Sequence, residues 1–184
     1  MPILVKIGLG REGVLAVGKQ ERIAAGAGPA LFGEAGLCNG TALRKATRRV
    51  SQLYDEILAP CELRSTQRSI LVHIARSGGA PAMGELATAL VLDRSALAHN
   101  LKPLERDGFV VVGVDPDDKR SRLIRLTREG EAKLAESTVL WAQAQHRFET
   151  AFGAEAARTL RGALALIASA EFGQAFAEAG ESTG

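Results

Sequence analysis

The stretch Met83–Arg128, MGELATALVLDRSALAHNLKPLERDGFVVVGVDPDDKRSRLIRLTR, contains two helical patterns followed by a strand pattern. Leu86, Ala87 and Leu90 have the spacing of one buried helix face, and a joint of about three residues separates this short helix from a longer one over 93–106. Asp93 is a suitable N-cap for that longer helix. The stretch therefore predicts a pair of helices joined by a tight turn.

The same stretch changes its period after Gly108, which we expect to end the longer helix. Residues 109–114 are rich in valine, and residues 122–126 can pair with them across a charged connection at 115–120. β-Branched residues favour strands, and two such runs around a polar turn indicate a hairpin. We therefore predict a short antiparallel hairpin directly after the helix pair.

Helical patterns flank this central stretch on both sides. Apolar residues at three- and four-residue steps predict a helix over 41–59 that Pro60 stops, and a second helix that begins with Ser65 as N-cap and ends at 76–79. After Thr127 the repeat Leu134, Thr138, Trp141, Ala144, Phe148 predicts a long helix with that face inward. Gly153 separates it from another helix that carries the stripe 156–167.

These elements predict a mainly α protein with a small β-hairpin wing, that is, a winged helix-turn-helix with flanking dimerisation helices. The chain has 184 residues, of which 46% are hydrophobic and only 4% aromatic, and this composition favours helices packed through small aliphatic side chains. We expect four parts: an N-terminal extension (1–37), a dimerisation helix (38–63), a winged helix-turn-helix (64–128) and C-terminal dimerisation helices (129–184). The glycine-rich extension is interpreted as a flexible arm or as sequence upstream of the natural start.

Charge is concentrated in the middle of the chain. Residues 64–128 hold eleven Lys and Arg against seven Asp and Glu, whereas residues 129–184 hold four against eight, so a basic segment precedes an acidic one. The two cysteines and three histidines provide no zinc-ligand spacing, and we find neither a signal peptide nor an apolar run long enough for a membrane span. We therefore expect a cytoplasmic protein without a metal or cofactor.

The outward face of the predicted helix over 93–106 is suited to contact a base edge. Its members are short or basic side chains opposite a leucine stripe, namely Arg94, Ser95, Ala98, His99 and Lys102. Arginine can bond the acceptor edge of guanine, alanine can contact a thymine methyl group, and lysine can neutralise phosphate. Followed by a basic hairpin, this face predicts a major-groove reader of duplex DNA.

The tip of the hairpin is basic, with carboxylates among the basic residues: it holds Lys119, Arg120 and Arg122 beside Asp117 and Asp118. A carboxylate beside an arginine can hold the guanidinium in one rotamer before it enters a narrow groove. We therefore expect the tip to contact the minor groove of the DNA.

Several short motifs together resemble the MarR family of bacterial transcriptional regulators, over about residues 38–172. They are Leu86-Ala87, Asp93-Arg94-Ser95-Ala96-Leu97, the run 104–110 (LERDGFV), Asp115-Pro116-x-Asp118-x-Arg120 and Leu126-Thr127. The resemblance implies a homodimer that binds a near-palindromic operator, usually as a repressor released by a small aromatic or phenolic ligand or by cysteine oxidation. It also implies that Arg120 is the minor-groove arginine, with Asp118 as its orienting partner. The apolar content of 41–59 and 130–172 independently favours a dimer interface there.

Three other interpretations come from single features. Cys38, just before the first long helix, lies where a helix N-terminus and Arg44 favour a thiolate, so an oxidant-sensing regulator is one alternative. A winged helix that binds only protein is another. The motif Gly8-x-Gly10-x-x-Gly13 could indicate a dinucleotide enzyme, but no βαβ unit follows it, and we expect no enzyme. We expect Cys61, His73 and His146 to pack in the core or an interface.

Overall fold

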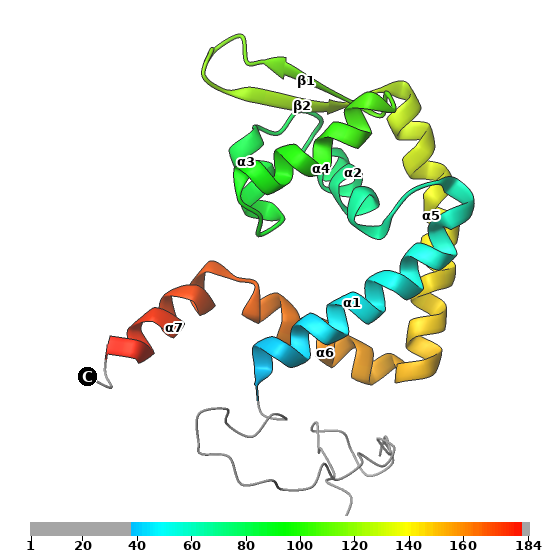
Figure 1. The fold of residues 1–184 in the computed structure, drawn as a ribbon, viewed down its shortest axis with the longest axis vertical. Coiled ribbons are helices and arrows are strands. Elements are labelled where there is room, and N and C mark those ends of the chain that lie inside the picture. The colour runs from blue at the N-terminus through cyan, green and yellow to red at the C-terminus, as the bar shows by residue number, and fades with distance from the viewer. Residues whose placement is uncertain (1–37, 182–184) are drawn as a thin grey trace, which may run out of the picture. The chain divides into compact units, whose positions relative to one another are not determined.

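The computed structural model describes residues 38–181 (Figure 1). The predicted extension over 1–37, with its glycine motif, lies outside the described residues. Contacts divide the chain into two compact units, one formed by Ala46–Phe148 and the other by the described residues on either side of it. All the predicted DNA-contacting side chains belong to the first unit.

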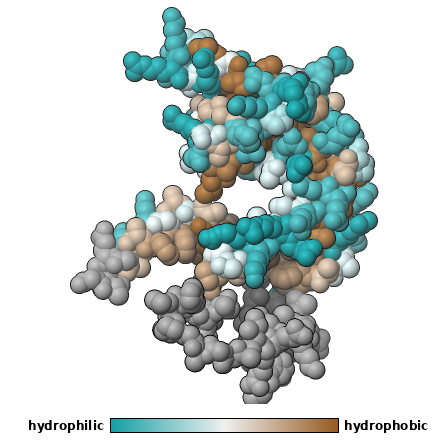
Figure 2. Space-filling model, viewed as in Figure 1, coloured by the Kyte–Doolittle hydropathy of each residue, from teal (hydrophilic) through white to brown (hydrophobic). Residues whose placement is uncertain are grey.

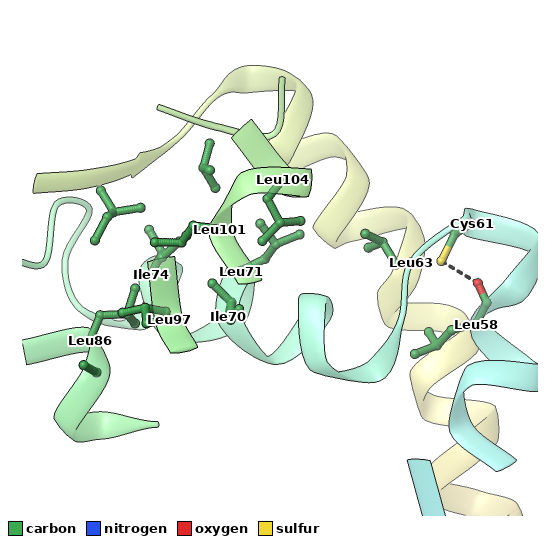
Figure 3. Close-up of a cluster of buried hydrophobic side chains, with 13 residues drawn as sticks. Leu58, Cys61, Leu63, Ile70, Leu71, Ile74, Leu86, Leu97, Leu101 and Leu104 are labelled. Atoms are coloured by element: carbon green, nitrogen blue, oxygen red, sulfur yellow. Dashed lines mark hydrogen bonds between the residues drawn. The ribbon is translucent and has the colours of Figure 1, made fainter. Parts of the chain in front are cut away.

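Helix α1 (Asn39–Leu58) begins two residues and ends one residue before the predicted bounds, 41–59, and Pro60 lies in the following 3-10 turn, η2 (Ala59–Cys61). Leu58 and Cys61 are buried, and the Cys61 thiol donates to the Leu58 carbonyl oxygen over 3.0 Å (Figure 3). The predicted packing role of Cys61 is therefore confirmed.

Helix α2 (Ser65–Arg76) begins one residue earlier than its predicted cap implies, because Ser65 is the first helical residue and not the N-cap. The Arg64 N–H donates to Gln67 Oε1 (2.8 Å), and the Ser65 N–H donates to Asp55 Oδ1 of α1 (2.6 Å). The Asp55 carboxylate thus satisfies an N–H in the first turn of α2. Because Asp55 lies ten residues before Ser65, the local sequence around α2 could not indicate this partner.

Helices α3 (Met83–Ala89) and α4 (Arg94–Arg106) form the predicted pair. Asp93 caps α4 as expected, with Oδ1 accepting from the Ala96 N–H at 2.7 Å. In the turn between the helices, Val91 has a φ of 53°, which is unusual for a β-branched residue. Gly108, with a φ of 75°, follows the end of α4 and turns the chain into the hairpin.

Strands β1 (Val110–Val114) and β2 (Arg122–Leu126) pair antiparallel, with Val110 opposite Leu126 and Val112 opposite Ile124. The Ile124 N–H also donates to the Pro81 carbonyl (3.0 Å), so the segment before α3 lies along β2. Figure 1 shows the hairpin leaving the end of α4, with its tip reaching back over α3. Backbone bonding thus sets the direction of the wing.

The core of this unit is aliphatic and joins α2, α3, α4 and the hairpin (Figure 3). Its fully buried members include Leu71, Ile74, Leu97, Leu104 and Ile124. Each buried side chain of this size stabilises the fold by roughly 1.5–3 kcal/mol. The predicted leucine stripe of α4 is confirmed, and it holds the opposite face of that helix toward solvent.

Helix α5 (Arg128–Phe152) is long, and Gly153 separates it from α6 (Ala154–Ile167), both as predicted. Its predicted inward face is only partly correct: Ala144 is buried, but Thr138 and Trp141 are exposed and Ser137 is buried instead. A further helix, α7 (Ala170–Glu181), was not predicted as a separate element. Within residues 38–181, none of the helices has the length and apolar content that a membrane span requires.

Candidate nucleic-acid interface

The outward face of α4 is arranged as the sequence predicts. Arg94, Ser95, His99 and Lys102 are exposed, and Ala98 is half-buried, opposite the buried leucines of the helix. Because those leucines hold the helix in the core, the polar face has a defined orientation. Four side chains capable of bonding a base or a phosphate are thus presented along about two turns of helix.

Arg94 lies against α3, where its guanidinium approaches a glycine, Gly84. A Cβ atom placed on Gly84 would lie 3.1 Å from Arg94 Nη2, a tight contact that would require the guanidinium to shift by a few tenths of an ångström. The absence of a side chain at Gly84 therefore leaves the guanidinium in its present position unhindered. Local sequence does not indicate this role of Gly84, because its partner lies ten residues away on another helix.

The hairpin tip is ordered through its backbone. Asp118 Oδ1 accepts from the Arg120 N–H (2.9 Å), its carbonyl accepts from the Ser121 N–H (2.8 Å), and Asp115 Oδ1 accepts from the Asp117 N–H (2.9 Å). Lys119, Arg120 and Arg122 are exposed. We predicted that the Asp118 carboxylate would hold the Arg120 guanidinium, but it binds the Arg120 backbone, because a side chain this short reaches an N–H two residues on more readily.

A groove of about 720 Å³, which we call the wing groove, lies between α3, the start of α4 and the wing. Arg94, Arg120 and Arg122 all line it, so the structure brings one recognition-helix cation together with two wing cations. Ser95, Ala98, His99, Lys102 and Lys119 are not among its lining residues.

The carboxylates in this groove act on the backbone and do not neutralise its arginines. Asp93 accepts from the Ala96 N–H, a bond that lowers the pKa of its carboxyl, and Glu85 Oε2 accepts from the Ala82 N–H at 3.0 Å. None of the ion pairs formed within residues 38–181 includes Arg94, Arg120 or Arg122. Three guanidinium groups therefore remain available to an anionic partner.

The candidate redox residue, Cys38, is exposed just before α1. Hydrogen bonds from the Thr41 hydroxyl and backbone lower the pKa of its thiol, and Arg44 lowers it further. The thiolate is the reactive form of cysteine, so this environment favours reactivity. Of the two histidines expected to pack, His73 is half-buried with Nδ1 2.8 Å from the Ser69 carbonyl, whereas His146 is exposed in this chain.

A second cavity, of about 650 Å³, lies away from the wing groove and was not predicted from the sequence. Its walls come from the end of α2, the end of β2 and the first half of α5, including Ile74, Leu126, Leu134 and Thr138. Its volume falls in the usual range for small-molecule sites.

Comparison with known proteins gives a consistent family. The model of the MarR family matches residues 63–121, which include the helix pair and most of the hairpin. Among curated relatives, the transcriptional activatory protein BadR of Rhodopseudomonas palustris is 37% identical over 70 residues, 37% of this chain and 40% of that protein. The multiple antibiotic resistance protein MarR of Salmonella typhimurium is 30% identical over 93 residues, 50% of this chain and 64% of that protein. The chain thus spans less than two thirds of either relative.

A solved structure extends the likeness over nearly the whole of a relative. The transcriptional repressor CouR, bound to a 23-mer DNA duplex, is 31% identical, with a TM-score of 0.66 over 75% of this chain and 97% of that one. The similarity therefore includes the flanking helices as well as the winged helix. With this extent of agreement in sequence and fold, the chain belongs to the MarR family of transcriptional regulators.

Proposed function

We propose that this protein is a transcriptional regulator that binds duplex DNA as a homodimer. The observation that carries the proposal is the groove that Arg94 of α4 lines together with Arg120 and Arg122 of the wing, none of which forms an ion pair within residues 38–181. Such an arrangement matches the charge of a phosphate backbone. The similar protein CouR was solved bound to a DNA duplex, which supports the same class of partner here.

The two parts of the surface have separate roles in this proposal. The α4 face contacts the major groove through the exposed residues Arg94, Ser95, His99 and Lys102, with Ala98 beside them. The wing contacts the minor groove through Arg120, flanked by Lys119 and Arg122, while Asp118 holds the backbone of the turn.

The homodimer is supported by apolar surface that a single chain leaves uncovered. Figure 2 shows hydrophobic colour along α7 and the neighbouring end of α6. The large apolar residues exposed there are Leu164, Leu166, Ile167, Phe172 and Phe176. Contiguous exposed apolar patches mark protein interfaces, and a two-fold dimer matches a pseudo-palindromic operator with two winged helices.

We further propose that the regulator is a repressor released by a small effector that enters the 650 Å³ cavity between α2, β2 and α5. Movement of α5 or α2 on binding would change the position of the attached winged helix. The exposed Cys38, whose thiol has a lowered pKa, favours oxidation as a second route of release.

The test is direct binding to DNA. The full chain is titrated against a labelled duplex from the region upstream of its own gene and against a scrambled duplex, over a series of salt concentrations. We expect preference for the upstream duplex and an affinity that falls steeply as salt rises. Equal or absent binding to both duplexes, together with capture of a protein partner by the same face, would instead indicate a protein-interaction module.

A further inference from the structure

Val91, in the turn between α3 and α4, has a backbone conformation that valine rarely adopts. Its φ of 53° lies in the left-handed region, where a side chain branched at Cβ is strained. The residue is also 67% exposed, so burial of its isopropyl group does little to offset this strain. A strained residue that contributes little packing points to a function of its own.

Backbone hydrogen bonds fix this conformation. The Val91 N–H donates to the Thr88 carbonyl (3.1 Å). The Leu92 N–H donates to the Ala87 carbonyl (2.9 Å), and this pair of bonds is the Schellman motif that ends many helices, with glycine usual at its left-handed position. Leu90 and Leu92, on either side of Val91, pack against the core. The turn therefore requires the left-handed conformation, which glycine would adopt without strain.

The neighbours of Val91 belong to the proposed DNA-contacting surface. Thr88, Leu92 and Arg94 line the wing groove, and Val91 lies between the first two along the chain. Arg94 is also the first residue of α4, and the N-terminal residues of a recognition helix contact base edges. Leu92 is half-buried, whereas Val91 is exposed. An exposed apolar group is therefore present beside the end of α4 that is proposed to enter the major groove.

We propose that Val91 makes an apolar contact with duplex DNA, beside the part of the major groove that Arg94 contacts. The inference rests on the proposed function, because it adds a residue to the same DNA-binding surface. DNA offers two apolar groups to such a side chain, the C5-methyl group of thymine and the carbon atoms of deoxyribose. Contact with the methyl group adds preference for thymine at one position, whereas contact with the sugar adds affinity at any sequence.

Glycine at position 91 separates the contact from the fold. Val91→Gly should raise the Tm, because the left-handed backbone is then unstrained, and should weaken binding to the upstream duplex about three- to tenfold, because the isopropyl group is lost. The dependence of affinity on salt should stay that of the wild type, since valine neutralises no phosphate. Thermal unfolding and fluorescence anisotropy measure these effects. A residue that served only the fold would change stability and affinity in the same direction.

A matched variant and a modified duplex complete the experiment. Val111→Ala, which shortens an exposed valine of β1, should keep the wild-type affinity. Each thymine of the upstream duplex is then replaced in turn by deoxyuridine, which lacks the methyl group. If Val91 contacts that methyl group, one replacement should weaken the wild type about fourfold and leave Val91→Gly unaffected. If Val91→Gly binds more weakly but no replacement distinguishes it from the wild type, the contact is with deoxyribose.

The proposal is overturned if Val91→Gly binds the upstream duplex as tightly as the wild type does. It is also overturned if the Tm of this variant falls together with its affinity, because Val91 would then act through the fold. Both outcomes leave the DNA-binding proposal standing, whereas a wild type that binds no duplex overturns the two proposals together.

Discussion

Two residues of the wing have different roles: Arg120 supplies positive charge, and Asp118 holds the backbone of the turn. Arg120 is exposed at the wing groove and forms no ion pair with any of residues 38–181, whereas Asp118 binds the Arg120 backbone N–H at 2.9 Å. Charge directed at DNA and geometry of the loop can therefore be tested by different substitutions.

Replacing Arg120 with alanine should weaken operator binding by about 1–3 kcal/mol, or roughly 5- to 150-fold, with the Tm unchanged. The loss follows from removal of a cation whose side chain forms no ion pair within the described part of the chain. Fluorescence anisotropy with the upstream duplex provides the measurement. Arg106→Ala, at the far end of α4 where Arg106 pairs with Asp107, is the matched control and should retain affinity. An unchanged affinity for Arg120→Ala would remove Arg120 from the interface.

Asp118→Asn should retain most of the DNA affinity, whereas Asp118→Ala should lose about fivefold. An amide oxygen can still accept the Arg120 N–H, but a methyl group cannot, and one such bond contributes about 1 kcal/mol. Binding curves of the two variants at one salt concentration decide the matter. If both variants lose affinity equally, Asp118 acts through its charge on the guanidinium, contrary to the contact described.

At the scale of elements, the junction between the hairpin and α5 is closely packed. The Thr127 hydroxyl donates to the Gly108 carbonyl (2.6 Å) and accepts from the Gly130 N–H (2.9 Å), while the Thr127 N–H donates to the Phe109 carbonyl (3.1 Å). Gly130 is buried in the first turn of α5, directly against that Phe109 carbonyl. The wing and the long helix are therefore joined through backbone groups.

Gly130→Ala should destabilise the protein by about 2 kcal/mol or more, because the added Cβ would overlap with the Phe109 carbonyl oxygen and force the two elements apart. Urea unfolding followed by circular dichroism measures the change. The control is Gly162→Ala in α6, where a Cβ meets nothing within 4 Å and alanine favours the helix. Equal stability of Gly130→Ala and wild type would show that the junction can relax.

At the scale of the whole molecule, the proposed dimer relates two winged helices to one operator. Phe176 and Phe172 of α7 are 74% and 38% exposed, and their ring centres are 6.3 Å apart. A second copy is the occupant that would bury these rings together with the exposed residues of α6.

The double substitution Phe172→Ser and Phe176→Ser should shift the protein from dimer to monomer at micromolar concentration, and should weaken operator binding more than tenfold. The reason is the loss of apolar area at the interface and, with it, of the second reader. Analytical ultracentrifugation measures the first effect and anisotropy the second. Val111→Ser, which removes an exposed apolar side chain from the wing, should leave the sedimentation unchanged.

The sequence alone determined the order of elements in the winged helix and the outward face of α4. Caps such as Asp93, a glycine such as Gly108 and the valines of β1 act within a few residues, so their effect can be predicted from local pattern. The prediction of the buried face of α5 was only partly correct. Several faces of that helix are apolar enough to be buried, and only the elements packed against it decide that Ser137 is buried while Thr138 is exposed.

Only the tertiary structure decided which distant groups meet. It showed that Asp118 binds a backbone N–H, that Gly84 lies close to the Arg94 guanidinium, and that Arg68 packs over the Trp141 ring. The last two contacts join residues on different helices, and their distances depend on packing between helices, which a local pattern does not specify. The physical reason is that propensity and capping act along the chain, whereas cavities, close approaches and unpaired charges arise from the way its segments pack together.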